Sequence, residues 1–399
     1  MGMLDGIRVI DMTMNAAGPG AASMFADHGA EVIKVERPIT GDDCRSFGPF
    51  LHGVSLSDAW TNRGKKSVTV NLQDSEGVGF VKKLAANADI FLESFRPGVM
   101  ARLGLGYEVI REINPKIIYG SLTAFGQNGS YAKRPGYDII AQAMSGLMAA
   151  TGEPEGDPMP VGVALGDFVG AQNLYAGVMT ALYHRAMTGH GQWVDISLVQ
   201  GLIFMNGNLH QYAVGRKNAP RAGAHNSLLS PYGLHHGKDG QCAIVAAVGK
   251  KIWESLCDVI GHPELKEDPK FNNVAPRVAN RKELTAYIED WLKQFDNIND
   301  AVDILQAHGV PSCKVYGLED VILDKHFREQ GWIVEQSMPD NCGSDKTFFT
   351  RAPVGKYSEC QPQLHKGCVL GAYNHEVMAE YGYSEEDIDR LQKKWAEKK

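Results

Sequence analysis

One acidic residue stands out because its neighbours are almost all small or apolar. Asp167 lies in "PVGVALGDFVGAQ", where an apolar helical pattern begins. Gly162, Gly166 and Gly170 predict open space around the carboxylate. A helix N-terminus favours the ionised form, and an ionised, poorly hydrated carboxylate can attack an activated acyl group. The alternative is a capping residue that only accepts hydrogen bonds from free backbone N–H groups.

A second candidate site combines cations with an aromatic ring. Arg37 ends the strand-like "KVERP", and Phe95 and Arg102 lie in "ESFRPGVMARLG", which follows another strand-like run. Ligands of an open α/β sheet bind beyond the carboxyl ends of its strands, so these side chains are expected at one edge. They suit a nucleotide with phosphates, whereas the alternative is solvated surface charge. Further cations in "NRGKKS" are Arg63, Lys65 and Lys66.

The segment "GPGAAS", residues 18–23, half-matches a dinucleotide-binding glycine motif. It follows a strand pattern and opens a helix, and Glu36 ends the next strand, as that motif requires. The third glycine is replaced by Ser23, and the turn from Thr13 to Gly18 is slack. The sequence therefore favours a tight packing turn or a different ligand over a dinucleotide.

Two other kinds of catalytic site find no support in the sequence. The 13 histidines are scattered without HxxxH or HExxH spacing, so no metal site is predicted. There is no GxSxG segment, which argues against a serine nucleophile on a strand–helix turn.

Alternating strand and helix patterns must position these residues. Strand-like runs occupy residues 7–13, 31–36, 66–72, 89–95, 116–126 and 191–198. Helical patterns occupy 18–29, 75–88 (with Ser75 as the N-cap), 107–114 and 167–187, and another begins near Val199. This alternation predicts an α/β fold with a Rossmann-like open parallel sheet covered by helices on both faces.

The pattern changes near Arg216. Residues 234–248 predict a hairpin that turns at Lys238–Gly240, followed by helices at 250–261, 281–295 and 298–309 and a strand at 310–316. We expect a large α/β domain at 1–215, a crossover linker at 216–229, a smaller α+β domain at 230–320 and a C-terminal return to the large domain at 321–399. The chain's last segment predicts a capped, charged surface helix.

Composition limits the function classes. The chain has 399 residues and a net charge of -7 without a basic run, which argues against a nucleic-acid partner. No secretory signal or membrane-spanning run is evident, so no membrane partner is expected. The seven dispersed cysteines include no CxxC pair and predict free thiols in a reducing cytoplasm.

Seven segments together resemble the class III CoA-transferases nearly from end to end. They are "AGPGAASMFADHGAEVIKVERP", "NRGKKSVTVNL", "ESFRPGVMARLGLGYEVIREINPKIIYGSLTAFGQNG", "YDIIAQAMSG", "GDFVGAQ", "TGHGQWVDISL" and "GVPSCKVY". The resemblance implies that Asp167 is the acyl-carrying nucleophile. It also implies a CoA site lined by Arg37, Phe95, Arg102 and Tyr137, with Ala16 and Ala17 in the loop near the thioester. The family fold implies a homodimer of two ring-like subunits threaded through each other.

Two departures from the family narrow the activity. The segment "AGAHNSLLSPYG" lacks the glycine run of formyl-CoA transferases, which makes oxalate and formate doubtful substrates. Tyr137 stands where related acyl-CoA racemases carry a histidine, and a racemase needs a second base to deliver a proton.

The sequence thus predicts a cytoplasmic, homodimeric CoA-transferase that moves CoA from an acyl-CoA donor to a free carboxylic acid. Covalent aspartyl anhydride and thioester intermediates would form at Asp167, with each oxyanion stabilised by backbone N–H groups of the Asp167 helix turn. CoA is a substrate, and no metal or redox cofactor is implied. The alternatives are an acyl-CoA racemase, an NAD-dependent dehydrogenase that uses "GPGAAS", and a non-catalytic CoA-binding protein.

Overall fold

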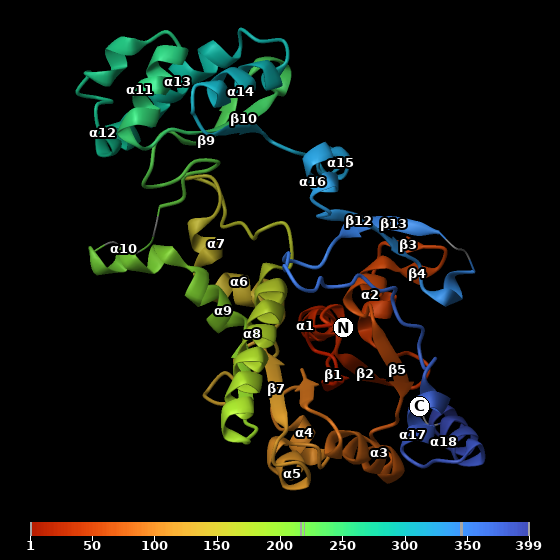
Figure 1. Cartoon of the computed structure of the whole chain (residues 1–399). Helices are drawn as coiled ribbons and strands as arrows, with labels where there is room; N and C mark the ends of the chain where they lie inside the picture. Colours follow the sequence, from red (N-terminus) through yellow and green to blue (C-terminus); the bar gives the residue numbers. More distant parts are fainter. Residues whose placement is uncertain (1, 216–217, 219, 344–345, 398–399) are drawn as a thin grey trace. The chain divides into compact units, whose positions relative to one another are not determined.

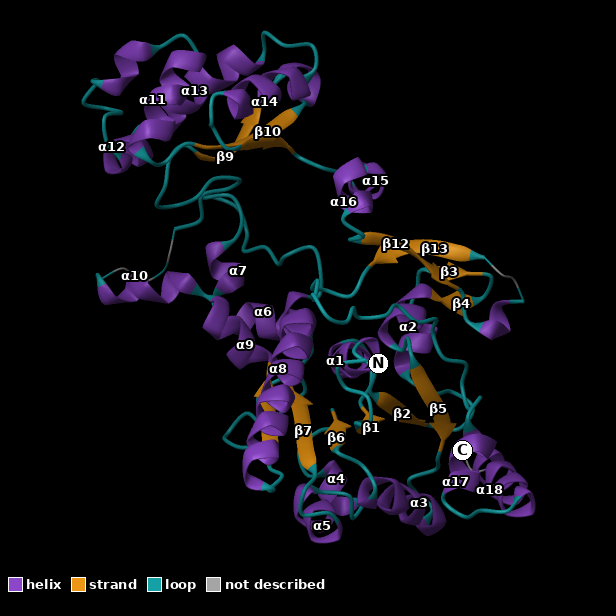
Figure 2. Cartoon of the chain, viewed as in Figure 1, coloured by secondary structure: helices purple, strands orange, loops and turns teal. Residues whose placement is uncertain are grey.

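The computed structural model describes residues 2–215, 218, 220–343 and 346–397 (Figures 1 and 2). Its chain divides into two compact units. The large unit comprises Met1–Ser145, Gly162–Asn206 and Asp324–Lys399, and the small unit comprises Gly146–Val161 and Gly207–Leu323. The expected domain limits remain a prediction, and the expected linker includes residues 216, 217 and 219, which lie outside the described residues.

The large unit is built on a six-stranded sheet in which every neighbouring pair is parallel. Its strands are β1 (Arg8–Met12), β2 (Glu31–Glu36), β5 (Lys65–Thr69), β6 (Ile90–Glu93), β7 (Ile118–Thr123) and β8 (Trp193–Ser197). Their spatial order is β5-β2-β1-β6-β7-β8, so the strand order reverses beside β1. The α/β class and the parallel sheet predicted from the sequence are confirmed, and the reversal point is where such sheets bind ligands.

Helices cover both faces of this sheet. Strands such as β1 and β6 are therefore buried on both sides. One face packs against α3 (Ser75–Ala86), α5 (Tyr107–Ile113) and the C-terminal helices α17 (Asn374–Glu380) and α18 (Glu385–Glu397). Figure 2 shows α1 (Ala17–Asp27) and α8 (Leu165–Thr188) on the opposite face.

Glycines bring α1 close to its neighbours. A Cβ built on Gly18 would lie 2.3 Å from the Cβ of Thr13, and one built on Gly20 would lie 3.7 Å from the Cβ of Ala171 in α8. Any side chain at Gly18 would therefore collide with the end of the β1 segment. This close packing accounts for the first glycine of "GPGAAS" without a bound dinucleotide.

Shorter elements complete the large unit. They are the 3-10 helices η1 (Asp43–Ser46) and η5 (Asp340–Cys342), the strands β3 (Phe50–Leu51), β4 (Val54–Ser55), β12 (Ile333–Ser337) and β13 (Thr347–Arg351), and the helices α2 (Leu56–Thr61), α4 (Val99–Arg102), α6 (Asp138–Met144), α9 (Leu198–Met205) and α16 (Lys325–Glu329). The strands β12 and β13 pair antiparallel, as do β3 and β4.

The small unit has a core of its own around an antiparallel sheet in the order β11-β10-β9. The predicted hairpin is confirmed, with β9 (Tyr232–His236) and β10 (Cys242–Ala246) joined through η3 (Lys238–Gly240), and β11 (Ser312–Lys314) is the predicted third strand. The three predicted helices are α11 (Lys250–Val259), α13 (Arg281–Leu292) and α14 (Ile298–Ala307). The remaining elements are α7 (Leu147–Ala150), η2 (Gly207–Leu209), α10 (His210–Ala213), η4 (Pro263–Lys266), α12 (Val274–Ala279) and α15 (Leu318–Leu323).

One local prediction was wrong. The N-cap of α3 is Asp74 rather than Ser75, because the Asp74 side chain accepts a hydrogen bond from the N–H of Glu76. The predicted capped, charged surface helix is confirmed as α18, which Ser384 caps by accepting from the N–H of Asp387, and its apolar side chains Ile388 and Trp395 are buried in the sheet core. In the described part of the chain, no helix combines the length and apolar character needed to cross a membrane.

Candidate active site

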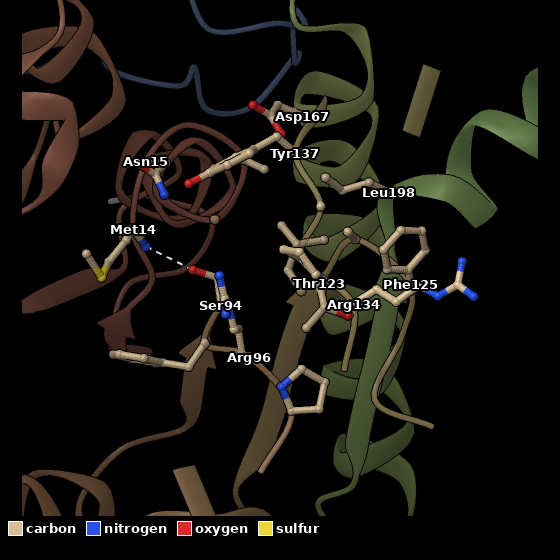
Figure 3. A pocket seen from close by; sticks show the side chains of 18 of the residues that line it. Met14, Asn15, Ser94, Arg96, Thr123, Phe125, Arg134, Tyr137, Asp167 and Leu198 are labelled. Atoms are coloured by element: carbon tan, nitrogen blue, oxygen red, sulfur yellow. Dashed lines mark hydrogen bonds between the residues drawn. The ribbon is translucent and has the colours of Figure 1, made fainter. Parts of the chain in front are cut away.

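A pocket of about 220 Å³ lies beyond the carboxyl ends of the central strands (Figure 3). It brings together five residues that the sequence singled out, which are Ala16, Ala17, Phe95, Tyr137 and Asp167. Figure 3 shows Asp167 and Tyr137 towards one end of the pocket and Ser94 and Arg96 towards the other. A carboxylate, a helix start and an aromatic ring thus share one cavity at the reversal point of the sheet.

Asp167 is held in the first turn of α8, whose N-cap is Ala164. The carboxylate is half-buried. Burial, together with the negative charge of Asp138, raises the pKa of Asp167 to about 6. The carboxylate is therefore ionised at neutral pH, as predicted, but its surroundings disfavour the charge rather than stabilise it. Such a group is the kind of perturbed acid that marks a reactive site.

Asp138 supports the start of α8 from the neighbouring helix α6. Its Oδ1 accepts hydrogen bonds from the N–H groups of Gly166 (2.5 Å) and Asp167 (3.4 Å). Its Oδ2 accepts one from the side chain of Gln142 at 2.7 Å. The prediction that the N–H groups of the Asp167 turn stabilise an oxyanion is thus wrong for these two donors, because Asp138 already uses them.

The glycines beside Asp167 serve close packing more than open space. A Cβ on Gly166 would lie 2.9 Å from Oδ1 of Asp138, and one on Gly170 would lie 2.4 Å from Cδ2 of Leu198. Of these three glycines, Gly162 alone has no atom within 4 Å of a built Cβ. The expectation of open space at Gly166 and Gly170 was wrong, since each allows another side chain to reach α8.

The start of α1 supplies other backbone donors to the pocket. Ala16 is the N-cap, and Ala17 and Gly18 are in the first turn, where N–H groups precede the helical hydrogen-bond ladder. The loop before them is fixed because the N–H of Met14 donates to Oγ of Ser94 at 2.9 Å (Figure 3). The positive end of this helix therefore faces the same cavity as the Asp167 carboxylate.

A second pocket of about 260 Å³ adjoins the first, and Met14 and Phe95 line both. Arg37 lines this second pocket with Leu72 and Gln73. A ligand could therefore extend from Asp167 past Phe95 towards Arg37. The Arg37 side chain is exposed and pairs with Asp43.

Two of the predicted residues lie at the edges of this region. Tyr137, the N-cap residue of α6, is 72% exposed at the rim of the first pocket. Arg102 ends α4, is exposed, and is not among the residues that line either pocket. The structure thus brings together all the predicted site residues except Arg102.

The cations of "NRGKKS" are structural. Each pairs with a carboxylate of the sheet or of α1: Arg63 with Asp27 (2.9 Å), Lys65 with Asp11 (2.8 Å) and Lys66 with Glu31 (2.8 Å). Lys65 and its partner are fully buried, so this pair is part of the fold and not a ligand site.

Asp138 is the residue of this site that sequence reasoning missed. It follows Tyr137 in "GYDIIAQ", but a carboxylate at the start of a helix is usually read as a cap. Nothing in the sequence pairs Asp138 with Asp167, because the two residues lie 29 positions apart in the chain.

Comparison with known proteins decides the family. The family described as CoA-transferase family III matches residues 4–367. The chain belongs to CoA-transferase family III. As a family III CoA-transferase, it transfers CoA between acyl donors and carboxylic acids.

Individual relatives of this family III CoA-transferase cover most of its length. Succinyl-CoA:glutarate CoA-transferase of Mus musculus is 38% identical over 392 residues, which is 97% of this chain and 88% of the relative. Acetyl-CoA:oxalate CoA-transferase of Acetobacter aceti is 38% identical over 312 residues, or 78% of this chain and 80% of the relative. The crystal structure of a CAIB/BAIF family protein from Brucella suis superposes with a TM-score of 0.82 at 32% identity, covering 95% of this chain and 99% of that one.

Proposed function

We propose that this CoA-transferase works through a covalent intermediate on Asp167. The observation that carries the proposal is the half-buried carboxylate, which shares a cavity with the N-terminus of α1 and has a pKa raised to about 6. A carboxylate with this pKa is ionised at neutral pH and little solvated, which suits a nucleophile. The negative charge of Asp138 adds to its reactivity by disfavouring the ionised form.

Four steps complete the transfer. The Asp167 carboxylate attacks the donor thioester and releases CoA thiolate, leaving a mixed anhydride. The thiolate attacks the aspartyl carbonyl and releases the donor acid, leaving an aspartyl-CoA thioester. The acceptor carboxylate attacks that thioester and releases the thiolate, which then attacks the acceptor acyl carbon. The products are the new acyl-CoA and free Asp167. None of the four steps hydrolyses a thioester or an anhydride.

Each of these steps forms an oxyanion that needs hydrogen-bond donors. Ala17 and Gly18 line the pocket at the positive end of α1, and first-turn N–H groups suit this task. They replace the donors of the Asp167 turn, which Asp138 occupies. Water must be excluded during these steps, because hydrolysis would waste the thioester.

The acceptor class we propose is a dicarboxylic acid. The names of the mouse and Acetobacter aceti relatives specify glutarate and oxalate, and both acids carry two carboxylates. The missing glycine run made oxalate doubtful, and the 38% identity to the oxalate enzyme weakens that argument. A panel of acyl-CoA donors against mono- and dicarboxylic acids, read by mass spectrometry, tests the proposal. Failure to form any new CoA ester would contradict it.

The CoA nucleotide is proposed to extend past Phe95 into the second pocket. Replacing Arg37, which lines that pocket, with Ala should raise the KM for acyl-CoA about tenfold with little change in kcat, because nucleotide contacts act as uniform binding. Arg102→Ala should have a smaller effect in the same direction, since Arg102 lines neither pocket. Steady-state kinetics with varied acyl-CoA checks both. A normal KM in the Arg37 variant would exclude that residue from the CoA site.

We also propose the interlocked homodimer that the family fold implies. Exposed apolar side chains such as Phe204 (90%) and Tyr212 (74%) support an extensive subunit contact. Threaded rings cannot separate without unfolding, so the dimer and the fold should be lost together. Mass photometry at low nanomolar concentration should therefore show only dimer. A folded, reversible monomer under these conditions would exclude interlocking.

The cytoplasmic location is likewise a proposal. It rests on the seven cysteines, all of which are free thiols in the structure.

A further inference from the structure

Arg351 is a cation held between two aromatic rings. It is the last residue of β13, and its Cζ lies 3.4 Å from the ring centroid of Trp60 and 5.3 Å from that of Phe168. The two rings are edge to face, with centroids 6.4 Å apart. The Trp60 Nε1 donates to the Arg351 carbonyl at 3.4 Å, which ties β13 to α2. The guanidinium of Arg351 is thus placed by contacts with two other elements, α2 and α8.

The charge of Arg351 is not neutralised by a described residue. No ion pair joins Arg351 to a carboxylate in the described part of the chain, and the residue stays open to solvent although the rings cover part of its guanidinium. Arg63 stacks on the same Trp60 ring at 4.3 Å, but its own charge is matched by Asp27. Burial against the rings and repulsion by Arg63 lower the pKa of Arg351 to about 10, so it stays protonated at neutral pH. A partly dehydrated cation of this kind is stabilised by an anion from solution.

Arg351 is linked to the proposed nucleophile, Asp167, through the side chain on which it stacks. Phe168, on which Arg351 stacks, directly follows Asp167 in α8. Arg351 is not among the residues that line the Asp167 pocket, whereas Arg96 and Arg134 are. Figure 3 draws Arg96 towards the end opposite Asp167, and Arg134 stacks on Tyr131 at 3.8 Å. Of these three cations, Arg351 is the one stacked on Phe168, so it is placed for a group that leaves the pocket from Asp167 along Phe168.

We propose that Arg351 binds the second carboxylate of a dicarboxylic acceptor while the first carboxylate faces Asp167. This inference rests on the proposed function and assigns its acceptor specificity to a residue. The planar guanidinium presents paired N–H donors that match a carboxylate, and the rings of Trp60 and Phe168 keep that fork in one orientation. A monocarboxylic acid would leave the fork without its partner, so the site discriminates between the two classes.

The test compares a dicarboxylic with a monocarboxylic acceptor of equal length, glutarate and pentanoate, with one acyl-CoA donor. Arg351→Met keeps an apolar stem on Trp60 but removes the charge, and Arg351→Lys keeps the charge but not the fork. Arg328→Met is the matched control, because Arg328 also stacks on an aromatic ring, that of Phe349 in β13, at 5.0 Å. The melting temperature of each variant reports whether the fold survives.

Arg351→Met should raise the KM for glutarate about 100-fold with kcat little changed, and leave kcat/KM for pentanoate within about threefold. Arg351→Lys should fall between wild type and Arg351→Met, and Arg328→Met should behave as wild type. Equal losses for both acids, or an unchanged preference for glutarate, would overturn the inference while leaving transfer through Asp167 intact. A wild-type enzyme that transfers CoA to neither acid, or prefers pentanoate, would refute the proposed acceptor class first, and the role of Arg351 would fall with it.

Discussion

Asp167→Ala should abolish CoA transfer while the protein stays folded and binds CoA. The carboxylate is the only acid among the described residues that line the pocket, and the proposed steps all pass through it. Loss of a nucleophile should lower kcat by about a thousandfold or more. Acyl-CoA formation followed by mass spectrometry measures the loss, and calorimetric titration with CoA measures the retained affinity. Activity within about tenfold of wild type would rule out covalent catalysis at Asp167.

Asp167→Asn separates the loss of the nucleophile from a loss of structure. The pKa of Asp167 is raised by burial in the folded state, so the wild-type carboxylate costs stability once it ionises. The variant should therefore be more stable than wild type by about 1 kcal/mol at pH 7, allowing for solvent screening of a half-buried group. The difference should shrink as the pH falls through 6 and vanish near pH 4. Thermal melts across this range check the sign, and a less stable Asp167→Asn protein at pH 7 would contradict it.

Local patterns were enough to predict the parallel sheet and to single out Asp167 as the candidate nucleophile. Strands such as β1, β2 and β6 are short, largely apolar runs bounded by turn residues, and this signal does not depend on the rest of the chain. Asp167 was conspicuous because a carboxylate in an apolar stretch is costly unless it has a purpose. These inferences needed only neighbours in the sequence.

The parts that failed depend on residues far apart in the chain. Gly166 looks the same in the sequence whether it leaves space or admits another side chain, and Asp138, which fills that space, lies 28 residues away. The role of Lys65 was hidden for the same reason, because its partner Asp11 lies on another strand. Arg351 gave no signal, since its two ring partners come from α2 and α8. Pairing across elements is a tertiary property that local pattern does not encode.

Asp138 contributes to the site through both its hydrogen bonds and its charge, and two substitutions separate them. Asp138→Asn keeps an oxygen that can accept from the N–H of Gly166 but removes the negative charge. Asp138→Ala removes the acceptor as well, which leaves the start of α8 without its anchor. Asp195→Asn is the matched control, because Asp195 also accepts from a backbone N–H, that of Gln127 at 2.9 Å, which does not belong to the start of α8.

Asp138→Ala should lower kcat by about 100-fold, because a small displacement of the nucleophile is enough to misalign it. Asp138→Asn should lose less activity and change its pH dependence instead. The charge of Asp138 raises the pKa of Asp167, so its removal lowers that pKa and moves the acid limb of the kcat/KM profile from near pH 6 to lower pH. The Asp138→Asn enzyme would then stay active at an acidic pH at which protonation of Asp167 inactivates the wild type. Asp195→Asn should leave the acid limb in place. An acid limb that stays near pH 6 in Asp138→Asn would show that burial alone sets the pKa of Asp167, and Asp138 would then act only by anchoring the start of α8.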